Sequence, residues 1–148
     1  MGAFNGWIGV SFAFGMLFVA RKVTRIFHAE WIAAWAMLIT ALGQIFFFLP
    51  LSPIWVWILA FPIAGSDMLA YTTILTSFSN TANDRSQGWV MGVAVAVMAV
   101  AWVISGLGTN LLDIMGANVI ITIGGVCLLL SSGLMFLYSL LHKNESMS

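Results

Sequence analysis

Five apolar runs dominate this chain of 148 residues. They cover residues 2–20, 30–49, 53–78, 88–110 and 117–141. A run of about 20 mostly apolar residues is long enough to cross the hydrocarbon core of a bilayer as an α-helix. Hydrophobic residues make up 61% of the chain and charged residues 7%, which leaves too little polar surface for a water-soluble domain of this length.

The runs are continuously apolar, whereas the strands of a membrane β-barrel alternate apolar and polar residues over about ten positions. In lipid, the backbone polar groups of such a run are satisfied only within a helix. We therefore expect an all-α integral membrane protein in which residues 1–148 form a single transmembrane domain of five helices.

The basic residues fall only in alternate connections between the runs. They are Arg21, Lys22, Arg25, Arg85 and Lys143. Because positively charged loops stay in the cytoplasm, these connections are predicted to be cytoplasmic, with the N-terminus outside and the C-terminus inside. Short connections, the absence of a targeting segment and a single cysteine favour a bacterial inner membrane.

Residue patterns typical of enzymes are absent from the sequence. The two histidines, His28 and His142, flank apolar runs, and Cys127 lies within the last run. These three residues form no metal-ligand spacing, and no nucleophile motif or phosphate-binding loop occurs. We therefore expect no catalytic residue, no metal, no cofactor and no nucleic-acid partner.

The runs differ in the size of their side chains. Glycine and alanine recur at helical spacing in the first and fourth runs, for example at Gly88 and Gly92, and such residues let transmembrane helices approach closely. These two runs are predicted to pack against protein. Bulky stretches at 46–48 and 128–130 suggest that the second and fifth runs face lipid.

Asp67 is the one acidic residue deep within the third run. An ionised carboxylate near the centre of a bilayer costs roughly 2.5 to 3.5 kcal/mol on insertion scales, so it usually faces a polar cavity or a partner. Tyr71 lies four residues later, on the same helix face. Pro62 and Gly65 weaken the helix one turn earlier, as happens where a backbone bends around a site.

The segment 77–92 resembles the connection between the tenth and eleventh helices of major facilitator superfamily transporters. The matching residues are Ser77, Gln87, Gly88 and Gly92. The basic segment after the first run resembles the copy of the family's loop motif between helices eight and nine. Gly15 and the basic residues Arg21, Lys22 and Arg25 remain, while the aspartate and the second glycine of that motif are absent.

On this resemblance, the five runs correspond to helices eight to twelve of such a transporter. The resemblance implies a partial C-terminal half-bundle in which the third run lines the central cavity and the first and fourth runs lie near the boundary between the two halves. Because these transporters rock one half against the other around a central site, the chain is expected to need the N-terminal half or another subunit.

Two functions remain open from the sequence. The first is the C-terminal part of a secondary transporter that moves a small solute by alternating access, with coupling to an ion gradient. In that case Asp67 and Tyr71 are candidates for the substrate or proton site, with a protonated or hydrogen-bonded structural acid as the alternative. Arg21, Lys22 and Arg25 either set topology, which we favour, or form gating contacts. The second function is a five-helix accessory or structural membrane subunit.

Overall fold

The computed structural model describes residues 2–49, 52–83 and 85–145, with the backbone alone for residues 81 and 142–145. Within these residues the chain is helical and contains no strand. The elements are α1 (Gly2–Phe14), the π-helix η1 (Gly15–Ala20), α2 (Arg21–Val23), α3 (Ala29–Phe46), α4 (Pro53–Thr81), α5 (Gln87–Gly108), the 3₁₀-helix η2 (Thr109–Leu111), α6 (Leu112–Met115) and α7 (Ala117–Glu145).

Five helices are long and apolar enough to cross a membrane, as the sequence predicts. The first is continuous through α1, η1 and α2 and extends to Val23, so the predicted basic connection begins three residues later than expected. The connection expected between the fourth and fifth runs, residues 111–116, is also mostly helical, because α6 occupies Leu112–Met115. That the whole chain is one transmembrane domain stays a prediction.

The helix ends follow from local sequence. Ser52 is extended (φ −67°, ψ 153°) and Pro53 occupies the first turn of α4, where its missing N–H costs nothing because that group has no partner within a helix. Gly116 separates α6 from α7 with φ 78°, a backbone conformation that glycine adopts without strain. Pro62 does not end α4, which continues as α-helix to Thr81.

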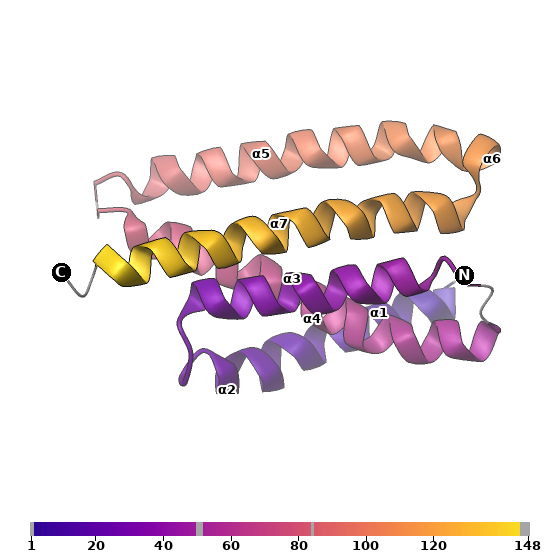
Figure 1. Cartoon of the computed structure of the whole chain (residues 1–148), viewed down its shortest axis with the longest axis horizontal. Helices are drawn as coiled ribbons and strands as arrows, with labels where there is room; N and C mark the ends of the chain where they lie inside the picture. The colour runs from indigo at the N-terminus through magenta and orange to yellow at the C-terminus, as the bar shows by residue number, and fades with distance from the viewer. Residues whose placement is uncertain (1, 50–51, 84, 146–148) are drawn as a thin grey trace.

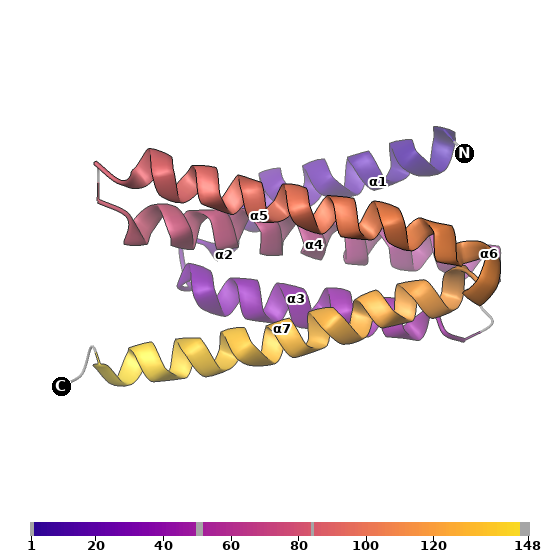
Figure 2. The ribbon, with the colours of Figure 1, turned by 90° about the horizontal axis from the view of Figure 1, so that it is seen from above.

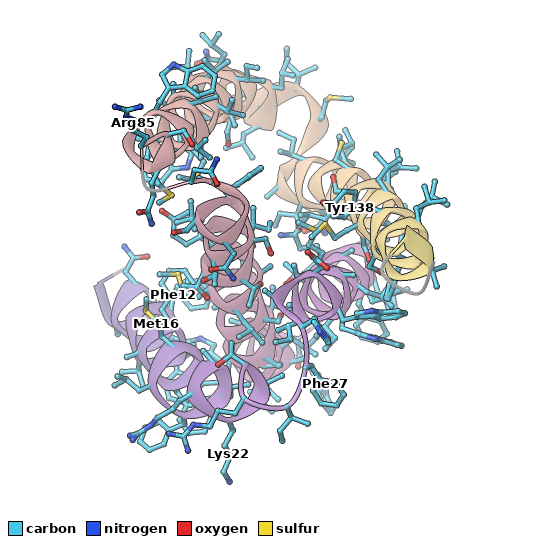
Figure 3. All side chains as sticks on the ribbon, turned by 90° about the vertical axis from the view of Figure 1, so that its left-hand side faces the viewer. Phe12, Met16, Lys22, Phe27, Arg85 and Tyr138 are labelled. Carbon is cyan, nitrogen blue, oxygen red and sulfur yellow. The ribbon has the colours of Figure 1, made fainter. Side chains whose placement is uncertain are left out.

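The helices are arranged around α4 and α3 (Figure 1). α3 packs against both α4 and α7, while the first transmembrane helix packs on α4 from its other side. α5 lies near α4 beside the connection between them and diverges from it toward α6 (Figure 1 and Figure 2), and the contacts between these two helices are sparse compared with those made by α3. Seen end on, α4 is central, with the first helix below it and α5 above (Figure 3).

Most of the buried residues of the described structure belong to α3 and α4. On α3 they are Ile32, Ala33, Ala34, Ala36, Thr40 and Ala41, and on α4 they are Ala60, Ala64, Leu69, Ala70 and Thr73. The sequence suggested that α3 faces lipid, and one of its faces is open, with Trp35, Ile39, Leu42 and Phe46 exposed. The prediction is wrong for the alanine-rich face, which lets α4 and α7 approach closely.

The segments that carry basic residues lie at one end of the bundle. α2, the connection between α4 and α5 and the C-terminal end of α7 all reach the same end in Figure 1. The N-terminus, α6 and the connection between α3 and α4 lie at the opposite end. The segments with basic residues thus share one end of the bundle, as the positive-inside rule requires. That this end faces the cytoplasm stays a prediction.

Candidate functional site

The candidate site is in the middle of α4. Asp67 lies fourteen residues after Pro53 and thirteen before Asn80, the two ends of this transmembrane segment (67 − 53 and 80 − 67). At 1.5 Å per residue, Asp67 is therefore about 20 Å from either end of the helix. A helix of this length places the carboxyl group near the centre of the hydrocarbon core.

One side of α4 contacts the first transmembrane helix through backbone. A Cβ atom added to Gly15 would lie 2.7 Å from the carbonyl oxygen of Gly65, closer than real Cβ atoms approach. A Cβ on Gly65 would lie 3.5 Å from the carbonyl oxygen of Ser11. Gly15 begins the π-helical segment η1, and π-turns within α-helices often occur at functional sites. The absence of a side chain at Gly15 therefore permits the first helix to pack against the backbone of Gly65, two residues before Asp67.

A second side of α4 contacts α3 through hydroxyl groups. The Oγ of Ser66 lies 2.8 Å from the Oγ1 of Thr40, which is fully buried. Ser66 Oγ also lies 2.8 Å from the carbonyl oxygen of Pro62, and Thr40 Oγ1 lies 3.0 Å from that of Ala36. Each hydroxyl has one proton, so one donates to the other hydroxyl while the second donates to a carbonyl of its own helix.

Asp67 lies on a third side of α4. Successive residues of an α-helix are rotated by about 100°, so Asp67 is turned away from both the Gly65 contact with the first helix and the Ser66 contact with α3. Its side chain is exposed, and Tyr71, one turn later on the same face, is 39% exposed. Among the described residues, neither the Ser66 hydroxyl nor the Tyr71 hydroxyl is hydrogen-bonded to Asp67. The structure therefore does not show the alternative in which Asp67 is a structural acid hydrogen-bonded to one of these hydroxyls.

A groove of the described structure lies elsewhere. It is a groove of about 570 Å³ between the first helix, α3 and α4, and Ser66 and Leu69 are its contributions from α4. Asp67 and Tyr71 do not line it. The two candidate residues thus face the surface of α4 that this chain leaves open, rather than a cavity enclosed by its own helices.

The three basic candidates Arg21, Lys22 and Arg25 are exposed at the end of the first helix. Together with Leu17, Phe18 and Ile26 they line a smaller groove of about 460 Å³. Among the residues whose side chains are described, none of these cations forms an ion pair with a carboxylate. A gating contact for them is therefore not found within this part of the chain.

The two candidates for helix packing have free space beside them. They are Gly88 and Gly92. A Cβ atom added to either glycine would meet nothing within 4 Å. Their helix is instead fixed at its start by Gln87, whose Nε2 donates to the Oγ of Ser79 at 2.7 Å across the connection between α4 and α5. That Gly88 and Gly92 pack against another helix stays a prediction.

Several contacts were not found from the sequence. Ser132 of α7 is buried and its Oγ donates to the carbonyl oxygen of Ala34 at 2.8 Å. Gln44 of α3 lies against the glycine pair of α7, because a Cβ on Gly125 would lie 3.0 Å from the Cβ of Gln44. Isolated polar residues within apolar runs were the available signal, and they indicate helix contacts without identifying the partner helix.

Comparisons with known proteins add no relative. No protein-family model, curated protein or solved structure matches the chain. In the described part of the chain, no group of three histidine, cysteine, aspartate or glutamate residues is placed to hold a metal ion.

Proposed function

We propose that this chain is the C-terminal portion of a secondary active transporter of the major facilitator type, which moves a small solute by alternating access. The observation that carries the proposal is an unpaired carboxylate in the middle of a transmembrane helix. Asp67 is exposed on the side of α4 turned away from the first helix and from α3. Intramembrane acids are rare because of their cost, and they usually mark the path of an ion or substrate.

The chemistry of the site fits ion-coupled transport. A carboxylate at this depth either accepts a proton or pairs with a cationic group of the solute, and both reactions remove its charge from the apolar surroundings. The Tyr71 hydroxyl, one turn away, adds a hydrogen-bond donor and acceptor for the same solute. Competition between proton and solute for Asp67 is the simplest way in which such a site couples a gradient to transport.

The small-residue faces of two helices support the proposal. The open residues Gly88, Gly92, Ala96 and Ala99 share one face of α5, and the partly covered residues Val90, Ala94 and Met98 lie on the opposite face. In α1, Gly2, Gly6 and Gly9 also meet nothing within 4 Å, while Trp7 and Phe14 on its other side contact Phe61 of α4. Both stripes point away from the helices of this chain, as expected where two halves of a transporter meet.

The same open stripe on α5 also favours a second candidate function, a five-helix accessory subunit that assembles with another membrane protein. The two candidates differ in the size of the native product. An immunoblot of membranes with an antibody against residues 142–148 separates them. A band two to three times heavier than 16.1 kDa supports the transporter, and a stable band at 16.1 kDa supports the subunit.

The transport proposal is tested by Asp67→Asn in the native membrane, where any further half or subunit is present. Gradient-driven accumulation of a panel of labelled sugars, amino acids and cationic dyes is measured across the pH range. For any solute that is accumulated, we expect the variant to fall to the level seen after the proton gradient is collapsed. Glu30→Gln is the matched control, because it also converts an acid to its amide, but in the first turn of α3 rather than in the middle of a helix. Unchanged accumulation in Asp67→Asn at every pH contradicts the proposal.

A further inference from the structure

The groove between the first helix, α3 and α4 has a form unlike that of a solute site. Its volume is about 570 Å³, and its lining is almost wholly apolar. Along α3 the lining residues run from His28 to Ile39, which is about 16 Å of helix at 1.5 Å per residue. The groove therefore extends from the basic end of the bundle along the helices, over a length close to half the hydrocarbon thickness of a bilayer.

The groove is open to the surroundings of the bundle. Trp35 is 54% exposed and Ile39 is 50% exposed, although both line it. Its buried lining residues are Ile32, Ala36 and Leu69, all of them apolar. An extended apolar groove that runs along the helices and opens sideways matches an acyl chain better than a polar solute.

A cationic surface adjoins the end of this groove. Ile26 lines both the apolar groove and the smaller groove that contains Arg21, Lys22 and Arg25, so the two are neighbours. Glu30 is the one carboxylate between residues 21 and 31, and it lines neither groove. Lys22 and Phe27, one from each groove, lie close to the same edge in the end-on view (Figure 3).

We propose that the two grooves together bind one anionic glycerophospholipid. One acyl chain lies in the apolar groove along Trp31 and Trp35, and the phosphate headgroup lies at Arg21, Lys22 and Arg25. Charge complementarity selects this occupant, because three cations without a described carboxylate partner adjoin the polar end of the groove. Basic pockets of this kind at the cytoplasmic ends of transmembrane helices bind anionic headgroups. The inference is independent of the transport proposal.

The test uses tryptophan fluorescence of the full chain reconstituted into bilayers of phosphatidylcholine. Brominated phosphatidylglycerol or brominated phosphatidylcholine is added at equal mole fraction, since bromine on the acyl chain quenches an indole that it contacts. We expect phosphatidylglycerol to be favoured at least about fivefold at the groove, because each basic residue near the headgroup contributes about that factor. The excess quenching is expected to disappear in the double variant Trp31→Phe/Trp35→Phe, which removes the two reporters.

The headgroup contact is tested by the triple variant Arg21→Gln/Lys22→Gln/Arg25→Gln. We expect its preference for phosphatidylglycerol to be lost, while Arg85→Gln keeps it. Arg85 is a matched control because it lies at the same end of the bundle but on the opposite side from Lys22 (Figure 3). Circular dichroism confirms that each variant is helical.

Results from the unaltered chain and from the variants can each overturn the proposal. Equal quenching by the two brominated lipids would show that the groove takes lipid without selecting charge. Quenching of Trp31 and Trp35 by neither lipid would show that protein covers the groove. An effect of Arg85→Gln equal to that of the triple variant would show general surface attraction in place of a site. Each of these results contradicts the inference.

Discussion

α3 and α5 contain similar small residues but differ in what they contact. Four alanines of α3 are buried, namely Ala33, Ala34, Ala36 and Ala41. No residue is buried in α5, all of which is described, although it also carries alanines and glycines at helical spacing. The more apolar of the two helices is thus the less covered. Small residues permit helices to approach in lipid but do not by themselves bring a partner.

The difference between the two helices lies in specific contacts. α3 receives a hydrogen bond from Ser132 at its Ala34 carbonyl, and Thr40 meets Ser66 of α4. The described side chains of α5 make one such interhelical bond, from Gln87 at its first turn. Because lipid tails are as apolar as leucine or valine, close backbone contact and hydrogen bonds decide which faces associate.

The largest effect is expected from Gly15→Val, which attacks a packed face directly. The new Cβ would be 2.7 Å from the Gly65 carbonyl oxygen, so the first helix and α4 must separate. We expect the free energy of unfolding to fall by about 1 to 3 kcal/mol, as for other overpacked sites. Unfolding by titration with a denaturing detergent from mixed micelles measures it.

Gly92→Val in α5 is the control for this substitution, because a Cβ there meets nothing within 4 Å. Its free energy of unfolding is expected to stay within about 0.5 kcal/mol of the unaltered chain, as for other open positions. Equal losses in the two variants would contradict the contrast between packed and open helices.

A smaller effect is expected from Ser132→Ala, which removes the bond to the Ala34 carbonyl. Interhelical hydrogen bonds in membranes average about 0.6 kcal/mol, so we expect a loss of that size in the same titration. The neighbouring Ser131→Ala is the matched control, since Ser131 is exposed and donates within its own helix to the Cys127 carbonyl oxygen. A loss of stability in Ser131→Ala as large as that in Ser132→Ala would show that the bond between helices stabilises the fold no more than a bond within one helix.

The five helices could be predicted from the sequence because hydrocarbon thickness imposes a minimum length of apolar run. The start of the third helix at Pro53 and the mid-helix acid Asp67 could be predicted equally well. The helix faces that pack against one another could not be predicted, because in a membrane an apolar residue has the same preference for lipid as for protein. Gly65 illustrates the limit, since it was interpreted as a helix-weakening residue but serves as a backbone contact for Gly15.

The site itself was predicted only in part. The sequence placed Asp67 and Tyr71 on one face of the third transmembrane helix, and the described structure leaves both exposed. It did not reveal that Ser66, the neighbour of Asp67, is already engaged by Thr40 from another helix. Contacts between residues that are 26 positions apart in the chain cannot be derived from helical periodicity alone.

The central claim is that the Asp67 face of α4 meets water rather than lipid, and thiol labelling tests it most directly. Cys127 is the only cysteine, so Cys127→Ser provides a background into which Tyr71→Cys is introduced. Asn83→Cys, in the connection after α4, and Val97→Cys, at an exposed residue of α5, are the water-exposed and lipid-exposed references. We expect a charged, membrane-impermeant thiol reagent to modify Tyr71→Cys in membranes at a rate close to that of Asn83→Cys. Modification as slow as that of Val97→Cys would place the face in lipid and contradict the account.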